Sequence, residues 1–204
     1  RNIVTSFTTV TALSTGIAAA GTHTGGYTLV ADSDTSSIVV TGGDGTATAN
    51  VANSGLAAGT YAAGTASITS TAQTVAGGGT AKVLVLGDLV INGVGIGATS
   101  DTDDTASSQA YTSSDAAASG ISIAAAINRA SSETGVTATV NATTVVGGTA
   151  AEIAAAGTAV LGEAVDLYIN GTSIGALTGT GTKATDITNT VDLITTKAGQ
   201  TGVP

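Results

Sequence analysis

The sequence predicts a β-rich α+β fold in which antiparallel hairpins and sheets carry two short amphipathic helices. Three observations lead to this fold class. Short β-branched runs alternate with glycine-rich turns in the N-terminal part of the chain. Two Asn-Gly pairs, the preferred residues of a type I′ hairpin turn, lie within apolar runs. Each pair is followed by a segment whose apolar residues recur at helical spacing, so we expect repeated hairpin–loop–helix–strand units.

Residues 1–80 predict a β-rich subdomain. Strands are expected at residues 26–30, 37–40, 59–61 and 65–69, where threonine and β-branched residues dominate. The sequence Gly-Gly-Asp-Gly at 42–45 indicates a tight turn between strands. These strands are expected to form an antiparallel sheet or part of a sandwich.

Residues 81–148 predict a first complete unit. The apolar runs 83–86 and 89–91 lead to the turn pair at 92–93, and the polar stretch 99–114 is expected to be an exposed loop. A helix is predicted over 115–130, with its end at Gly135 and a strand at 136–140. We expect the helix to pack its apolar face, which includes Ile123 and Ile127, on the sheet, because a helix this short is marginal alone.

Residues 149–204 repeat the pattern. Segment 166–175 matches segment 88–97 at seven of ten positions with an offset of 78, and segment 194–203 aligns with 127–136 with an offset of 67. Because the second offset is smaller, the loop between hairpin and helix is shorter in the second copy. The second helix is expected to bury a stripe made of Ile187, Val191, Ile194 and Ala198.

The repeated unit resembles the IN motif of bacterial flagellins, which decorates their variable central (outer) region. The second copy departs from the pattern at Thr195, where Ile-Asn would be expected. The matching residues are Ile91, Asn92, Gly93, Ile127, Asn128, Gly135 and Val136 in the first copy, and Ile169, Asn170, Gly171, Ile194, Gly202 and Val203 in the second.

The resemblance implies a surface-exposed outer domain of a filament subunit that contributes to the bacterial flagellum and motility. Its expected location is extracellular, its partners are other copies of the subunit, and surface Ser or Thr residues are candidates for O-linked glycans. The filament-core helices of such a subunit are not visible, and the second copy stops before the strand that follows the first. We therefore expect residues 1–204 to be a piece of a longer chain.

Composition argues against several other classes. The chain has 14 acidic and 5 basic residues, a net charge of −9, which disfavours binding to nucleic acid or to an anionic membrane. With no cysteine and one histidine, disulfide scaffolds, thiolate sites and histidine-based catalytic sets are excluded. No enzymatic activity, cofactor or resident metal is expected.

Four local patterns are candidate sites. Gly93, Gly95 and Ala98 satisfy a dinucleotide-binding pattern, but a polar stretch follows where the helix should open, so a hairpin turn is favoured. The acidic residues at 101–104 lack the glycine and distal glutamate of an EF-hand loop, which favours a solvated loop over calcium. His23 has no second ligand type near it. Asn141 and Asn170 match the N-glycosylation pattern, although the hairpin already explains Asn170.

Two alternative functions remain open. A hook-associated or filament-cap protein uses the same motif, and the full-length termini would separate it from a filament subunit. A Thr-rich adhesin or ice-binding module is suggested by the Thr-Ala-Thr sequences at 46–48 and 137–139. Flat solenoids of that kind require a short fixed period, whereas the repeat found here has offsets of 67 and 78 and contains a helix.

Overall fold

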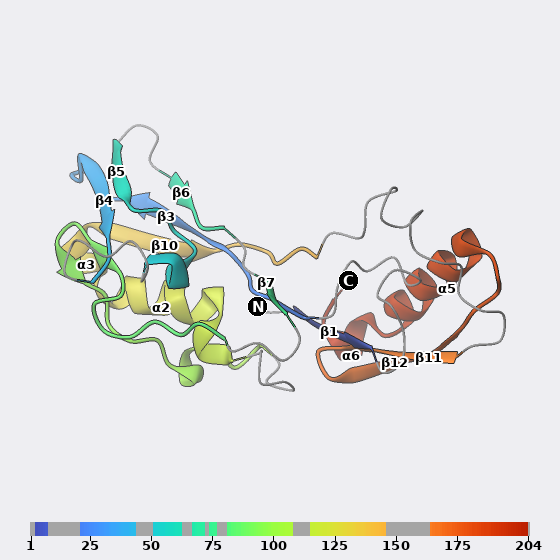
Figure 1. The fold of residues 1–204 in the computed structure, drawn as a ribbon. Helices are drawn as coiled ribbons and strands as arrows, with labels where there is room; N and C mark the ends of the chain where they lie inside the picture. The colour runs from blue at the N-terminus through green and yellow to red at the C-terminus, as the bar shows by residue number, and fades with distance from the viewer. Residues whose placement is uncertain are drawn as a thin grey trace.

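The computed structural model describes residues 3–7, 21–43, 51–62, 67–71, 74–76, 81–107, 115–145 and 164–203. Within these ranges the strands form three antiparallel sheets and the helices are short, which confirms the predicted sheet-rich α+β fold class. Figure 1 shows the elements in two lobes that lie side by side. The larger lobe is called the central unit and the smaller lobe the terminal unit.

The strands in chain order are β1 Ile3–Phe7, β2 Gly21–His23, β3 Tyr27–Ala31, β4 Ser37–Thr41, β5 Gly59–Ala62, β6 Ser67–Thr69, β7 Thr74–Ala76, β8 Val90–Ile91, β9 Val94–Gly95, β10 Val136–Val140, β11 Ala164–Ile169 and β12 Thr172–Thr178. The helices are the 3-10 turns η1 Ala52–Ser54, η2 Asp101–Asp103 and η3 Ala116–Ala118, and the α-helices α2 Gly120–Arg129, α3 Ser131–Thr134, α5 Lys183–Thr196 and α6 Ala198–Thr201.

Each sheet combines strands from the predicted N-terminal subdomain with strands from later in the chain. The sheet orders are β12-β11-β1-β2-β7, β10-β3-β6 and β5-β4-β8-β9. Strands from both sides of the expected boundary after residue 80 therefore pair within each of the three sheets. The hairpins β8–β9 and β11–β12 each take a further strand, β4 and β1 respectively, from the N-terminal part of the chain.

The central unit contains β3–β6, β8–β10, α2 and α3 around one hydrophobic core. Its strands at 27–31, 37–41, 59–62 and 67–69 agree with the strands expected from the sequence. Tyr27 is 1% exposed, and its hydroxyl donates to the carbonyl of Ser54 at 2.8 Å. Burial raises the pKa of Tyr27 well above its ordinary value, so the phenol stays neutral and serves as a donor.

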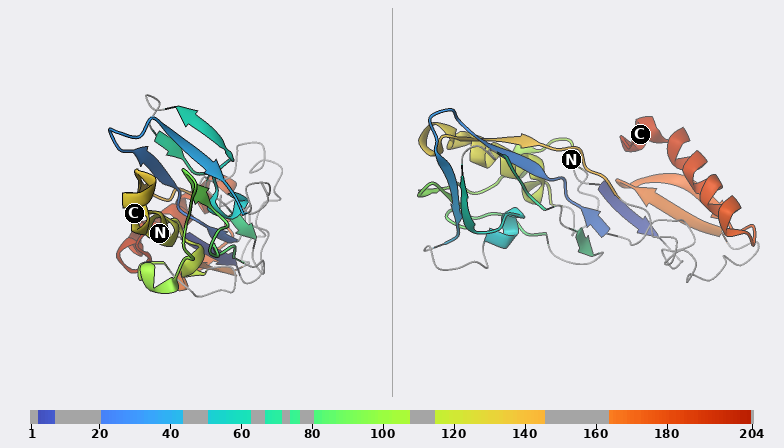
Figure 2. Two further views of the ribbon diagram at one scale, coloured as in Figure 1. Left: turned by 90° about the vertical axis from the view of Figure 1, so that its left-hand side faces the viewer. Right: turned by 90° about the horizontal axis from the view of Figure 1, so that it is seen from above.

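The terminal unit contains β1, β11, β12, α5 and α6 around a smaller core. The core side chains Leu167, Ile169 and Ile174 are between 0% and 3% exposed. Figure 2 shows α5 lying along one face of the β11–β12 hairpin. In the sequence, the elements of the central unit lie between β1 and β11, and these two strands pair antiparallel in the terminal unit.

Two predicted apolar segments differ in the structure. Residues 83–86 form no strand; Leu84 is buried, but Val85 and Leu86 are 55% and 75% exposed. On α5, Val191 is 54% exposed, so the predicted apolar stripe is wrong at that position. The buried residues of α5 are Asp186 and Thr190, while Leu193 and Ile194 are part-buried against the core. Asp186 Oδ1 accepts from the Thr180 N–H and hydroxyl, and the Thr190 hydroxyl donates to the Asp186 carbonyl.

The first predicted helix is confirmed over α2. Ser119 caps it by accepting from the backbone N–H of Ser122 at 3.1 Å, and Ile123 and Ile127 are buried as expected. A Cβ built on Gly120 would lie 2.2 Å from the carbonyl oxygen of Gly25. The start of α2 therefore packs directly against the backbone between β2 and β3.

Candidate functional site

The first Asn-Gly turn joins three elements through one side chain. Asn92 and Gly93 have φ values of 50° and 82°, the positive angles that a type I′ turn requires, which confirms the predicted hairpin. The Asn92 backbone N–H donates to the Val39 carbonyl at 2.9 Å, and its Oδ1 accepts from the Val39 N–H at 2.7 Å. Its Nδ2 donates to the Thr134 carbonyl at 2.8 Å. The turn is thus tied to β4 and to the end of α3; we call this arrangement the asparagine clamp.

The second Asn-Gly turn forms the same clamp. Asn170 and Gly171 have φ values of 52° and 77°. The Asn170 backbone N–H donates to the Val4 carbonyl at 2.8 Å, and its Oδ1 accepts from the Val4 N–H at 2.8 Å. Its Nδ2 donates to the Thr201 carbonyl at 2.8 Å. The turn, β1 and the end of α6 are therefore held as in the central unit.

The helix ends explain why an amide is needed at these positions. Gly135 and Gly202 adopt φ values of 65° and 67°, so each helix ends in a left-handed residue, as the sequence predicted for Gly135. The last carbonyls of a helix have no partner within the helix. The carbonyls of Thr134 and Thr201 receive the Asn Nδ2 donors instead, so the clamp satisfies a buried group in each unit.

The sequence predicted the strand at 37–40 but not its pairing with the first hairpin, and it predicted no strand at β1. Val39 in β4 and Val4 in β1 supply both backbone partners of the clamp, although they lie far from it along the chain. A signal was present, because Ile38-Val39 repeats the dipeptide Ile3-Val4. A dipeptide this common is not distinctive without the structure.

Asn128 has a separate role in the central unit. Its Nδ2 donates to the Ala138 carbonyl at 3.0 Å, and its Oδ1 accepts from the Ala138 N–H at 2.7 Å. This pair fixes α2 on β10. Thr195, at the corresponding position of α5, is exposed, and its hydroxyl donates within the helix to the Val191 carbonyl.

The other motif residues lie in the two cores. Ile91 and Ile169 are 0% and 3% exposed, and each immediately precedes a clamp asparagine. The other apolar motif residues of the central unit, Ile127 and Val136, are fully buried. Their counterparts in the terminal unit, Ile194 and Val203, are part-buried.

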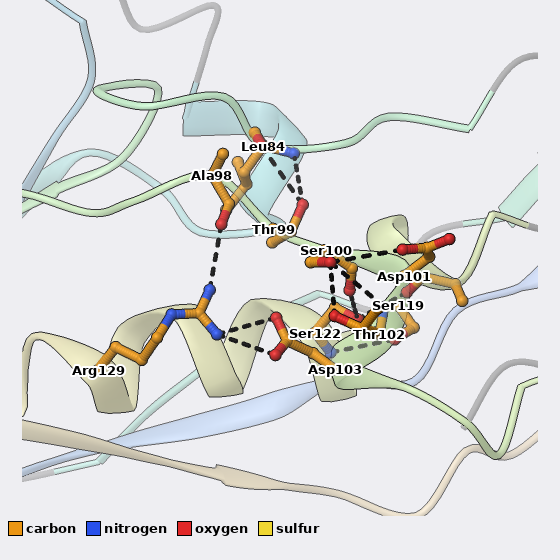
Figure 3. Close-up of polar contacts among 11 residues, drawn as sticks. Leu84, Ala98, Thr99, Ser100, Asp101, Thr102, Asp103, Ser119, Ser122 and Arg129 are labelled. Atoms are coloured by element: carbon orange, nitrogen blue, oxygen red, sulfur yellow. Dashed lines mark hydrogen bonds and ion pairs between the residues drawn. The ribbon is translucent and has the colours of Figure 1, made fainter.

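The predicted exposed loop is only partly exposed over its described residues, 99–107, because Asp104 is buried and four residues are half-buried, whereas Asp101, Thr102, Thr105 and Ala106 are exposed. Asp103 accepts from Nη1 of Arg129 at 2.9 and 3.0 Å, and Nη2 of Arg129 donates to the Ala98 carbonyl at 3.1 Å (Figure 3). The Ser122 hydroxyl donates to the Ser100 carbonyl at 3.0 Å. These contacts hold η2 on α2. Residues 108–114 of the predicted loop lie outside the described part.

Asp104 is the clearest departure from the prediction, because it is 2% exposed. Its Oδ1 accepts from the backbone N–H groups of Ala106 and Ser107, both at 2.9 Å, and its Oδ2 accepts from the Ser107 hydroxyl at 2.5 Å. Burial opposes ionisation, but these hydrogen bonds and one from Ser119 outweigh it and lower the pKa of the carboxyl. Asp104 is therefore an ionised turn cap whose oxygens already have donors.

The other candidate sites are accounted for by secondary structure. Gly93 and Gly95 belong to the β8–β9 hairpin, and no helix opens there. His23 lies in β2, where it pairs with Ile3 and Thr74. Asn141 exchanges side-chain hydrogen bonds with Thr28. Part of the predicted turn at 42–45 is described, where Gly43 has a φ of 58°; its later residues are outside the described ranges.

A groove of about 460 Å³ lies between β12 and α5. Thr178 and Asn189, which line it, correspond to Ser100 and Ser122 of the central unit. There, η2 and η3 pack on this side of α2. The groove lining also includes Leu177, Thr180, Asp192 and Leu193.

Comparison with protein-family models, with curated proteins and with solved structures finds no match. Over the described ranges, no group of three or more His, Asp or Glu side chains is placed to hold a metal ion. No helix among the described residues is long and apolar enough to cross a membrane.

Proposed function

We propose that the chain is a structural, non-enzymatic outer domain of a flagellin-like filament subunit. The observation that supports this proposal is the pair of asparagine clamps. They make the motif residues Ile91-Asn92-Gly93 and Ile169-Asn170-Gly171 equivalent in conformation, burial and hydrogen bonding, as expected if both belong to one kind of building block.

The path of the chain is suited to such a domain. Ile3 and Val203, the first and last described residues, both pack against the core of the terminal unit. A domain that projects from a filament needs its two ends close together, because the rest of the subunit must connect at one end. Figure 1 places the N-terminus and the C-terminus closer to the terminal unit than to the far end of the central unit.

The surface chemistry supports the same role. A net charge of −9 on 204 residues favours solubility and repels neighbouring copies, over about 8 Å at physiological salt. In this proposal the partners are other copies of the subunit, the location is extracellular on the bacterial flagellum, and exposed Ser or Thr hydroxyls carry any O-linked glycans.

The test is immunogold electron microscopy with Fab fragments raised against residues 1–204, applied to cells that express the full-length protein. Labelling along the whole filament is expected. Labelling confined to the filament tip or to the hook junction would instead establish the filament-cap or hook-associated alternative. Absence of label from flagella, with the protein detected elsewhere on the cell, would overturn both.

A further inference from the structure

The two clamp asparagines lie in the sequence context in which a side-chain amide is most easily lost. Asn92 and Asn170 are each followed by glycine, and the chain contains no other Asn-Gly pair. Glycine has no Cβ to shield its backbone nitrogen from the neighbouring side chain. Gly93 and Gly171 are both exposed, so water reaches each pair. Both clamps therefore carry the chemical groups that deamidation requires.

Deamidation of an Asn-Gly pair proceeds through a cyclic imide and consumes only water. The backbone nitrogen of the glycine loses its proton and attacks the asparagine Cγ, which forms a new C–N bond. The Cγ–Nδ2 bond breaks, and Nδ2 leaves as ammonia with the proton that the glycine nitrogen lost. A water molecule then adds to one of the two imide carbonyls and opens the ring to aspartate or isoaspartate.

In the folded chain the clamp holds the amide away from this reaction. To close the ring, the side chain must rotate until its Cγ meets the nitrogen of the next residue. Nδ2 of Asn170 donates to the Thr201 carbonyl and Oδ1 accepts from the Val4 N–H, both at 2.8 Å, so the rotation breaks two hydrogen bonds. The rate in the folded chain is therefore the rate in the open chain multiplied by the fraction of molecules whose clamp is open.

The two clamps differ in the packing that keeps them closed. Beside the first clamp, Ile127 and Val136 are 0% exposed and belong to the larger core. Their counterparts beside the second clamp, Ile194 and Val203, are only part-buried against the smaller core. Less apolar surface is exposed when the second clamp opens, so its opening costs less free energy. The second clamp is therefore open more often than the first.

The product at position 170 does not re-form the clamp. An ionised aspartate has no donor for the Thr201 carbonyl and places a second acceptor beside it. Isoaspartate in addition lengthens the backbone of the two-residue turn between β11 and β12. In either product the carbonyl at the end of α6 loses its side-chain donor.

We propose that Asn170-Gly171 is a site of spontaneous covalent modification, at which deamidation opens the second clamp and releases the end of α6 from the β11–β12 hairpin. Asn92-Gly93 has the same chemistry but is protected by the packing of the central unit. The modification adds a negative charge to the terminal unit, and refolding does not reverse it. This inference follows from the chemistry of the clamps and does not rest on the function proposed above.

The first experiment follows deamidation at both asparagines in the same folded chain. The protein is kept in mildly alkaline buffer, and the peptides that contain Asn92 or Asn170 are analysed by mass spectrometry at intervals. We expect Asn170 to react about tenfold faster than Asn92, because its clamp opens more often. In urea that unfolds the chain, both should react at similar rates, each about tenfold or more above its rate in the folded chain.

Three results of this experiment would overturn the proposal. Equal rates at the two asparagines in the folded chain would show that packing does not select the site. A faster reaction at Asn92 would place the modification in the central unit. A rate at Asn170 that is the same in the folded and the unfolded chain would show that the clamp gives no protection.

The second experiment tests the consequence of the modification. Asn170→Asp reproduces one product, and hydrogen exchange of its α6 amides is compared with that of the original chain, because exchange reports local opening. We expect exchange at α6 to be faster by about tenfold or more, with the amides of α3 unchanged. Asn189→Asp is the matched control, since it adds the same charge at an exposed position of α5 and should leave α6 exchange unchanged. Unchanged α6 exchange in Asn170→Asp would overturn the release of the helix end.

Discussion

Asn92 and Asn170 make the same three hydrogen bonds, at 2.7–2.9 Å, although they lie in separate units of the chain. Each occupies a left-handed conformation that most side chains avoid. Each also pairs with a strand from the N-terminal part of the chain and with the last carbonyl of a helix. A single side chain therefore fixes the relative positions of a hairpin, a strand and a helix.

Asn92→Ala and Asn170→Ala should destabilise the protein by similar amounts. Each removes two side-chain hydrogen bonds, leaves a helix-terminal carbonyl without its donor, and places alanine at a positive φ. We expect a loss of about 2–4 kcal/mol in the free energy of unfolding for each, measured by urea denaturation.

Asn92→Gly is the matched control, because glycine tolerates the positive φ but cannot form the side-chain bonds. It should cost about 1–2 kcal/mol, less than alanine at the same position. If Asn92→Gly and Asn92→Ala lower the free energy of unfolding equally, the positive φ at this position contributes little to the loss. If neither destabilises the protein, the clamp is not a stabilising feature.

The two helix isoleucines should differ in importance. Ile127 is fully buried, so Ile127→Ala should cost about 2–5 kcal/mol. Ile194 is only part-buried, and Ile194→Ala should cost about 1 kcal/mol, since less apolar surface returns to water. Equal losses in urea denaturation would contradict the burial difference. Val191→Ala, at an exposed position, serves as the neutral reference.

Much of the local structure could be predicted from the sequence because it depends on short-range chemistry. The type I′ turns follow from the Asn-Gly pairs, the end of α3 follows from Gly135, and α2 follows from the spacing of Ile123 and Ile127. In each case neighbouring residues alone determine the backbone conformation.

The remainder depends on contacts between distant segments. Val4 and Val39 become the strand partners of the clamps only when the sheets form. Asp104 looks like part of a solvated loop, but donors from its own turn allow its burial. Val191 fits the helical period, yet it is 54% exposed. The spacing of apolar residues along the sequence does not indicate which distant segments come into contact.

Asp104 should make stability dependent on pH. Its pKa is lowered in the folded state, so its contribution is present above the unfolded value of about 3.9 and is lost as the pH falls through the lower folded value. Asp104→Asn should cost about 1–3 kcal/mol at pH 7. The difference between wild type and variant should shrink as the pH falls from 4 toward 2, as measured by urea denaturation at each pH. Asp192→Asn, at an exposed position, is the control; a constant Asp104 difference over this range would contradict the prediction.

Gly120→Ala should disrupt the packing of α2 on the segment between β2 and β3. The added Cβ would meet the Gly25 carbonyl oxygen at 2.2 Å and its carbon at 2.9 Å, and both are backbone atoms that cannot rotate away. We expect a loss of about 1–3 kcal/mol and a lower thermal midpoint. Gly199 in α6 provides the matched control, because a Cβ there meets nothing within 4 Å. Gly199→Ala should be neutral or stabilising by up to about 1 kcal/mol, since alanine is the better helix former. If both variants melt alike, the close approach of Gly120 to Gly25 does not hold in solution.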